Sequence, residues 1–427
     1  MRTNLHKNIA NPSEFKKQLL LWSNYFREVV FLDSNDYSQI YSNYDCVLAV
    51  DAFTSIKTDS ENAFEDLHQY QSLTKDWLFG YLSYDLKNDI EELQSNNYDG
   101  LEFPDLFFFQ PKKLFLLKGN QLEIQYLNMC DDEMEDDFNE INQCMVFSIQ
   151  CSEIKIEQRI SKESYMDKVN KMLEHIQRGD IYEANFCLEF YSEYTKITPL
   201  ELYQKLNTIS ESPFAVYLKN NNQYLLSASP ERYLKKEGTK IISQPIKGTS
   251  KRYDTKEADE KSKKELSENP KERSENIMIV DLVRNDLSHT ATKGSVGVEE
   301  LCAIYTFKQV HQMISTVVST VEHTTSPIEI LRTTFPMGSM TGAPKISAMN
   351  IIENLEETKR GLYSGAVGYF TPNGDFDFNV VIRSILYNSK NQYLSFSVGS
   401  AITSLSKPEK EYEECLLKAK AMFEVLS

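Results

Sequence analysis

The segment SGAVGYFTPNGDFDFNVVIRSILYNSKNQYLSFSVGS (364–400) decides the fold class. It contains three apolar runs, at 365–370, 378–387 and 392–400, and the first two are separated by the turn Pro-Asn-Gly-Asp at 372–375. Turn residues between apolar runs are typical of β-hairpins. The segment therefore predicts three consecutive antiparallel strands.

The sequence outside this segment adds helices and a further strand. The segment ENIMIVDLVRNDL (275–287) is apolar enough for a buried helix, yet it carries several charged side chains, which are costly to bury unpaired. We expect this helix to start at Pro270 with Asn269 as N-cap, after a mobile loop over 252–269. Residues 409–426 predict an amphipathic helix, and 77–85 (WLFGYLSYD) a buried strand around Gly80. The chain is thus expected to mix helices with antiparallel strands.

Composition excludes several classes of protein. The 427 residues carry 46 Lys and Arg against 63 Asp and Glu, a formal net charge of −17. This acidity disfavours a nucleic-acid partner and an anionic membrane surface. The chain has no run of 18 apolar residues, its first ten residues are polar, and its seven cysteines are scattered. These features favour a cytoplasmic protein with reduced thiols and no membrane span.

Three acidic side chains and one lysine form a candidate binding site. Glu411, Glu414 and Lys418 follow one another at helical spacing, so they share one helix face. Glu275, at the start of the other charged helix, is a natural additional carboxylate for Mg²⁺, which prefers oxygen ligands. The alternative is an ordinary solvated helix face, and the sequence alone leaves both open.

Two further side chains have chemical potential. Lys247, in QPIKGT (244–249), is either a surface turn lysine or a nucleophile whose pKa is lowered by apolar surroundings. Glu231, in SPER (229–232), would be protonated more easily in an enclosed site and would then act as a general acid. The loop FPMGSMTGAPK (335–345) is either a helix-capping turn or a carboxylate-binding backbone, but it lacks P-loop spacing.

Taken together and in this order, eight motifs resemble the chorismate-utilising enzyme family. They are GDIYEANF (179–186), SASPER (227–232), PIKGT (245–249), ENIMIVDLVRNDL (275–287), GSMTGAPK (338–345), SGAVGYF (364–370), VVIRS (380–384) and EYEECLLKA (411–419). The resemblance implies an α+β fold, with two large antiparallel β-sheets packed face to face and helices outside. It also implies an N-terminal layer, residues 1–150, with a possible tryptophan pocket, followed by a chorismate-binding catalytic region, residues 155–427.

The lysine of PIKGT decides the branch of the family. Lysine at this position is typical of aminodeoxychorismate synthase component I, whereas anthranilate synthases usually have alanine. The resemblance implies that Lys247 attacks C2 of chorismate while Glu231 protonates the departing C4 hydroxyl. Ammonia then adds at C4 and expels the lysine, which gives 4-amino-4-deoxychorismate for 4-aminobenzoate and folate biosynthesis. Anthranilate synthase component I is the alternative.

The resemblance also implies the binding residues and a partner. The Mg²⁺ carboxylates fall on Glu275 and Glu414, with Glu411 beside them. Contacts to substrate carboxylates and the surrounding pocket fall on Thr249, Thr341, Gly342, Arg383, Gly399 and Lys418. No amidotransferase motif occurs in the sequence, so a separate glutamine amidotransferase subunit is expected to supply ammonia.

Several positions depart from the family pattern, among them residues 183 and 312. Glu183 stands where Gln is usual, and Gln312 stands where the family has an active-site histidine, with His311 one place earlier. The sequence assigns no role to Glu183, His311 or Gln312, and it does not give the oligomeric state or an ammonia channel.

Overall fold

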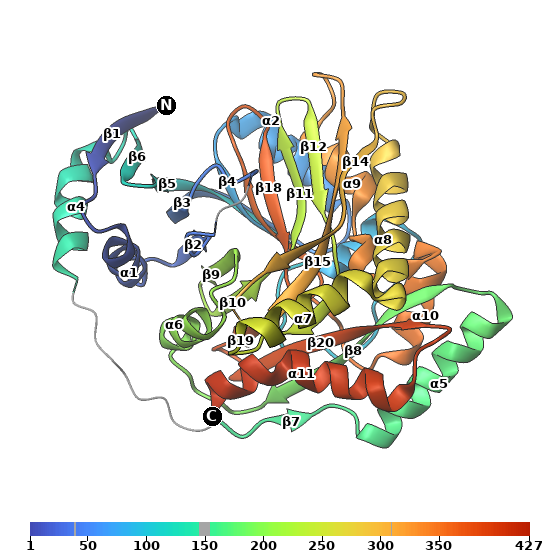
Figure 1. Ribbon diagram of the computed structural model, residues 1–427. Coiled ribbons are helices and arrows are strands. Elements are labelled where there is room, and N and C mark those ends of the chain that lie inside the picture. The colour runs from blue at the N-terminus through green and yellow to red at the C-terminus, as the bar shows by residue number, and fades with distance from the viewer. Residues whose placement is uncertain (38–39, 145–153, 309) are drawn as a thin grey trace.

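Twenty strands form one hydrogen-bonded network in the computed structural model, which describes residues 1–37, 40–144, 154–308 and 310–427. Every ladder between these strands is antiparallel, and the ladders divide the network into two sheets, as Figure 1 shows. This confirms the α+β class and the antiparallel sheets expected from the sequence.

The first sheet runs through ten paired strands and ends beside two short ones. In order of pairing these are β1 (Arg2–Asn8), β6 (Gln121–Leu127), β5 (Leu106–Lys118), β3 (Cys46–Thr58), β2 (Glu28–Asp33), β9 (Phe214–Asn220), β10 (Gln223–Ser229), β19 (Ser384–Asn388), β20 (Tyr393–Thr403) and β8 (Glu183–Ser192), with β7 (Glu157–Gln158) and β16 (Gly342–Ala343) beside β8.

The second sheet starts from the other end of β5. It continues through β4 (Leu78–Leu82), β17 (Ala366–Phe370), β18 (Phe376–Val380), β11 (Arg232–Glu237), β12 (Lys240–Gln244) and β15 (Val310–Thr320), which also pairs with β13 (Ile246–Lys251) and β14 (Gly297–Thr306).

The long strands β3 and β5 pass from one sheet into the other. Their register shifts between Ala52 and Thr54, next to Asp51, whose φ is 60°. Such a bulge bends a strand, which allows it to turn a corner between sheets. Side chains along β3 alternate accordingly: Val47 and Ala49 enter the core between the two sheets, whereas Leu48 and Val50 enter the core beneath the helices. The two sheets therefore pack face to face.

Helices cover the outer faces. They are α1 (Pro12–Ser23), α2 (Ala63–Thr74), α3 (Lys87–Ile90), α4 (Met134–Gln143), α5 (Lys162–Arg178), α6 (Pro199–Ser210), α7 (Lys256–Glu268), α8 (Pro270–Ser288), α9 (Pro327–Thr334), α10 (Lys345–Leu355) and α11 (Pro408–Leu426). Helix α11 packs on β20 and against α5, while α8 packs on β13 and β15 (Figure 1).

The strand expected around Gly80 is β4, and its partner explains the glycine. Gly80 lies opposite Gly368 of β17, and a Cβ atom at Gly80 would come within 1.9 Å of the Phe107 carbonyl oxygen of β5. The backbones approach too closely here for any side chain.

Two expectations about secondary structure are wrong. The apolar run 378–387 is not one strand, because Arg383 has a φ of 51° and separates β18 in the second sheet from β19 in the first. The expected mobile loop over 252–269 contains α7, although α8 begins at Pro270 as expected. The Asn269 side chain accepts hydrogen bonds from the backbone N–H groups of Lys271 and Glu272.

The division into residues 1–150 and 155–427 stays a prediction. Residues 145–153, which include Cys151 and part of the expected boundary, lie outside the described residues. Strands from both sides of that boundary share sheets, as β2 does with β9 and β4 with β17. The six described cysteines are free. Within the described ranges, no helix is long and apolar enough to cross a bilayer.

Candidate active site

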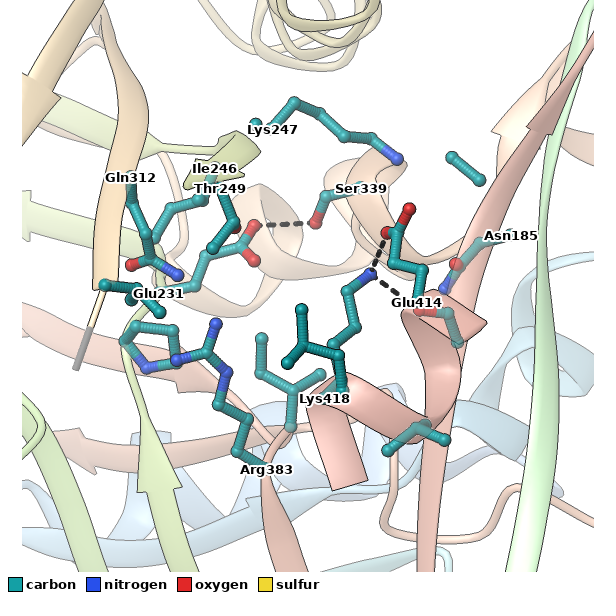
Figure 2. A pocket seen from close by; sticks show the side chains of 18 of the residues that line it. Asn185, Glu231, Ile246, Lys247, Thr249, Gln312, Ser339, Arg383, Glu414 and Lys418 are labelled. Carbon is teal, nitrogen blue, oxygen red and sulfur yellow. Dashed lines mark hydrogen bonds and ion pairs between the residues drawn. The ribbon is translucent and has the colours of Figure 1, made fainter. Parts of the chain in front are cut away.

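A cavity of about 660 Å³ lies where the two sheets meet. Its wall comes from β13, β20, α8 and α11, together with the loops at 230–231, 339–340 and 382–383. Nine of the eleven site residues expected from the sequence line it: Glu231, Lys247, Thr249, Glu275, Arg383, Gly399, Glu411, Glu414 and Lys418. Figure 2 shows that several of these side chains point toward a common space.

Lys247 enters the cavity from β13 and forms a buried ion pair. Its Nζ atom lies 2.8 Å from Oε1 of Glu183, the first residue of β8, and the two side chains are 12 % and 2 % exposed. Burial alone would lower the pKa of Lys247, but the Glu183 carboxylate outweighs burial, helped by Glu275 and Glu414. The pKa of Lys247 is therefore raised, so neither alternative open from the sequence holds: the side chain is not a surface turn lysine, and its pKa is not lowered. Lys247 is held as an ammonium group in this structure.

Glu231 lies between β10 and β11 and is nearly inaccessible to solvent, with 4 % exposure. Burial raises its pKa to about 7, against the opposing effects of a hydrogen bond from Ser339 and of the positive charge on Lys247. The Ser339 hydroxyl donates to Oε1 of Glu231 at 2.7 Å (Figure 2). A carboxyl group with a pKa near neutrality can hold a proton and release it, as a general acid must.

Arg383 presents a guanidinium group without a protein partner. Among the described residues, its side chain makes no hydrogen bond and no ion pair. Burial lowers its pKa to about 10, although the Glu231 charge opposes this, so it remains a cation at neutral pH. A buried, unpaired guanidinium favours an anionic ligand, and its planar fork matches a carboxylate.

The predicted face of α11 also faces the cavity. Lys418 Nζ lies 2.7 Å from Oε1 of Glu414 and donates to the backbone carbonyl of Gly399 at 2.8 Å. Burial alone would raise the pKa of Glu414, but Lys418 and more distant lysines lower it below its ordinary value. The space at Gly399 is tight, since a Cβ there would meet the Asn185 amide and Cys187 Sγ at 3.0–3.1 Å.

Two of the three carboxylates expected to hold Mg²⁺, Glu275 and Glu411, flank a different cation. Lys271 Nζ lies 3.6 Å from Oε1 of Glu275 and 3.8 Å from Oε1 of Glu411. Burial raises the pKa of Glu275 to about 7, against the lowering effects of Lys247 and Lys271. Buried Oε1 of Glu275 and buried Oε2 of Glu411 have no hydrogen-bond partner.

Carboxylate oxygens suit a hard cation such as Mg²⁺, and two of these are buried without a hydrogen-bond partner. They are not assembled around one point, however. Across the described part of the chain, no group of three or more His, Cys, Asp or Glu side chains is placed to hold a metal ion.

Two expected residues lie outside the cavity wall. Thr341 is fully buried, and its hydroxyl is directed at the carbonyls of Met337 and Gly338. Gly342 belongs to β16, where a Cβ would come within 2.2 Å of the Glu183 carbonyl oxygen. Their roles at the site stay predictions.

The structure separates the two residues at the family's histidine position. Gln312 lines the cavity and faces Thr249 across the β13–β15 ladder. His311, its neighbour on the same strand, instead contacts Asp259 of α7 at 3.0 Å and the Thr306 hydroxyl at 3.0 Å. Successive strand residues point to opposite faces, which explains this separation.

Three residues at the site are not predicted by the sequence. Glu183 departs from the family pattern, but its partner Lys247 is distant in sequence. Ser339 lies within the loop 335–345, in which the sequence marks only the backbone as a candidate anion site. Lys271 lies four residues before Glu275, a spacing that places both side chains on one helix face and could have signalled the contact.

Comparisons with known proteins identify the family of the chain. A family profile described as chorismate binding enzyme matches residues 27–424. An anthranilate synthase component I-like protein of Synechocystis is 36 % identical over 356 residues, which cover 82 % of this chain and 72 % of that protein. Aminodeoxychorismate synthase component 1 of Bacillus subtilis is 32 % identical over 390 residues, 87 % of this chain and 79 % of that protein.

A solved structure shares the fold. Anthranilate synthase component I from Streptococcus pneumoniae superposes with a TM-score of 0.77 at 24 % identity, over 91 % of this chain and 93 % of that one. This similarity shows that the two proteins share an architecture. The chemistry is inferred from the residues that line the cavity.

Proposed function

The chain belongs to the family of chorismate binding enzymes and is a chorismate-utilising enzyme, and from this premise we propose that it is an aminodeoxychorismate synthase, component I. In this proposal the enzyme converts chorismate and ammonia to 4-amino-4-deoxychorismate and water. The observation that carries it is Lys247, which lines the cavity together with the buried carboxyl group of Glu231.

Lys247 is the proposed nucleophile. Its nitrogen forms a bond with C2 of chorismate as the two ring double bonds shift and the C4–O bond breaks. A covalent amine divides a difficult substitution into two easier displacements. Ammonia then attacks C4, the C2–N bond breaks, and Lys247 is released.

Glu231 is the proposed general acid. Since its pKa is raised to about 7 by burial, a useful fraction of the carboxyl group is protonated at neutral pH. Its proton would leave with the C4 hydroxyl as water, and the hydrogen bond from Ser339 fixes the orientation of the carboxyl group. The carboxylate left behind can accept a proton from the new ammonium group at C4.

Arg383 and Lys418 are the proposed contacts for the substrate carboxylates, with Thr249 beside them. The guanidinium of Arg383 has no protein partner to release first. Lys418 is already anchored by Glu414 and the Gly399 carbonyl, which would hold it in position. We further propose that Glu275, Glu411 and Glu414 hold Mg²⁺. When bound, Mg²⁺ would neutralise a substrate carboxylate.

The proposed source of ammonia is a separate glutamine amidotransferase subunit. Free ammonium would replace it in vitro, so the reaction can be tested with this chain alone.

Anthranilate synthase is the second candidate, favoured by the name of the Synechocystis relative. That reaction ends in the elimination of pyruvate and gives no part to a covalent lysine. The two functions therefore differ in what Lys247 does.

Product identification tests the proposal. The protein is incubated with chorismate, Mg²⁺ and ammonium, with and without a lyase that converts aminodeoxychorismate to 4-aminobenzoate, and products are separated by chromatography with mass detection. We expect aminodeoxychorismate alone and 4-aminobenzoate with the lyase. Lys247→Ala should lose this product, whereas Lys256→Ala, at the exposed start of α7 and outside the cavity wall, should keep it. Fluorescent anthranilate as the main product would refute the proposal.

A further inference from the structure

Lys247 carries a charge that is incompatible with the attack proposed above. An amine forms a bond through its lone pair, and the ammonium form has none. Because the Glu183 carboxylate raises the pKa of Lys247, the free amine is scarce at neutral pH. The nucleophile therefore has to lose a proton inside the cavity before it can react.

Glu183 is the group best placed to take that proton. Its Oε1 lies 2.8 Å from Lys247 Nζ, which is hydrogen-bond distance. Among the described residues, no other acidic side chain lies within ion-pair distance of Lys247. The second oxygen, Oε2, is buried without any hydrogen-bond partner, so nothing else competes for the charge of this carboxylate.

The position of Glu183 suits a base rather than a ligand contact. It is 2 % exposed and does not line the cavity, whereas its partner Lys247 does, so Lys247 is the member of the pair that meets the space for substrate. The backbone of Glu183 is fixed on both sides, by Ala343 of β16 and by Thr403 of β20. A fixed base directly behind a nucleophile is the arrangement that activates serine and cysteine nucleophiles in other enzymes.

We propose that Glu183 is a catalytic residue, the general base that removes a proton from Lys247 as it attacks chorismate. This inference rests on the proposed function, and it names the acid–base partner that the function leaves open. Glu183 and Glu231 then divide the work between them, with a base behind the nucleophile and an acid at the leaving group.

The protons balance over one cycle. Glu183 takes a proton from the Lys247 ammonium, the C2–N bond forms, the C4–O bond breaks, and the hydroxyl leaves as water with the proton of Glu231. Ammonia then forms the C4–N bond, and the C2–N bond breaks with its electron pair returning to Lys247. Glu183 returns its proton to Lys247, and the new C4 ammonium gives a proton to Glu231. Both carboxyl groups end as they began, and chorismate and ammonia have become aminodeoxychorismate and water.

Glu183→Gln removes the base while keeping its size and polarity. The other acidic groups that act on Lys247 remain in this variant; they are Glu231 between β10 and β11, Glu272 and Glu275 on α8, and Glu414 on α11. The matched control is Glu189→Gln, a buried glutamate of the same strand whose ion-pair partner is Arg159. Thermal melting of each variant establishes that it is folded.

The first readout is the pH dependence of turnover. In the wild type Glu183 takes the proton during the attack, so turnover does not wait for solvent to deprotonate Lys247. In Glu183→Gln the amine has to form by exchange with solvent, and kcat at pH 7 should fall by about 10²–10⁴-fold, the usual contribution of a general base. The fraction of free amine in the variant rises about tenfold per pH unit below the pKa of Lys247, so the ratio of variant to wild-type kcat should rise about tenfold per pH unit. Taking the ratio removes the effect of Glu231, whose titration is common to both proteins.

The second readout is the reactivity of Lys247 itself. Acetylation of the protein by acetic anhydride at a series of pH values, followed by peptide mass spectrometry, gives the pH at which half of Lys247 reacts. We expect this pH to be lower in Glu183→Gln than in the wild type, and the ratio of kcat values to level off at the same pH. Glu189→Gln should change neither quantity.

Each failure has a distinct signature. Anthranilate as the wild-type product would overturn the proposed function and this inference together. The expected product with a pH-independent ratio of kcat values, or with full activity of Glu183→Gln at pH 7, would overturn the role of Glu183 alone. An unchanged acetylation midpoint would also overturn it, because Glu183 would then exert no control over the Lys247 proton.

Discussion

Replacing Glu231 by Gln should change the pH dependence of stability. In the native protein the Glu231 carboxyl is buried and nearly inaccessible, and burial raises its pKa to about 7 from an ordinary value of 4.5. Unfolding returns the group to water and to its ordinary pKa. Gln has almost the same shape and can accept the same hydrogen bond from Ser339, but it does not titrate.

The magnitude follows from the two pKa values. The interval from 4.5 to about 7 is roughly 2.5 pH units, and at 1.36 kcal/mol per unit it amounts to about 3 kcal/mol. Between these values the native state binds a proton that the unfolded state has already released. The free energy of unfolding therefore falls as the pH rises through this window, and the loss is complete above about pH 7.

Urea unfolding of both proteins from about pH 4.5 to about pH 8 measures this difference. The free energy of unfolding of Glu231→Gln minus that of the wild type should increase by about 3 kcal/mol as the pH rises from about 4.5 to above about 7. Glu413→Gln, on the exposed side of α11, serves as control and should follow the wild type. A constant difference between wild type and Glu231→Gln at every pH would show that Glu231 is not held as a neutral acid, and the reasoning about the general acid would fail.

Two further predictions concern ligands. Arg383→Gln removes an unpaired guanidinium whose hydrogen bonds to a carboxylate would be worth about 1.5–3 kcal/mol, so chorismate should bind about 10- to 150-fold more weakly by calorimetry; an unchanged Kd would exclude Arg383 from the substrate site. Lys271→Gln removes the ammonium that lies 3.6 Å from Glu275 and 3.8 Å from Glu411, so Mg²⁺ should bind on the order of tenfold more tightly in the absence of chorismate. Weaker or equal Mg²⁺ binding in that variant would contradict the view that Lys271 competes for these carboxylates.

Local patterns predicted much of the fold. The turn at 372–375 correctly predicted the hairpin of β17 and β18, and Pro270 and Asn269 correctly marked the start of α8. The run 378–387 misled because apolar composition does not show that Arg383 adopts a positive φ. That conformation moves the chain from one sheet to the other and depends on long-range pairing, which periodicity does not record.

The sequence predicted which residues line the cavity better than it predicted their ion pairs and pKa values. Helical spacing placed Glu411, Glu414 and Lys418 on one face, and all three line the cavity. Both sequence-based alternatives for Lys247, a surface turn lysine and a lysine of lowered pKa, are wrong, because the decisive carboxylate, Glu183, comes from a distant strand. Burial can be expected from an apolar neighbourhood, but an ion pair requires knowledge of which strands meet.

The central claim is that Lys247 forms a covalent bond with chorismate, and trapping that bond tests it most directly. The protein is mixed with chorismate and Mg²⁺ in the absence of ammonium, quenched rapidly and examined by peptide mass spectrometry. We expect the peptide that contains Lys247 to carry the mass of chorismate less one molecule of water, and we expect this species to disappear when ammonium is added. An unmodified Lys247 together with the release of anthranilate on addition of ammonium would contradict the account.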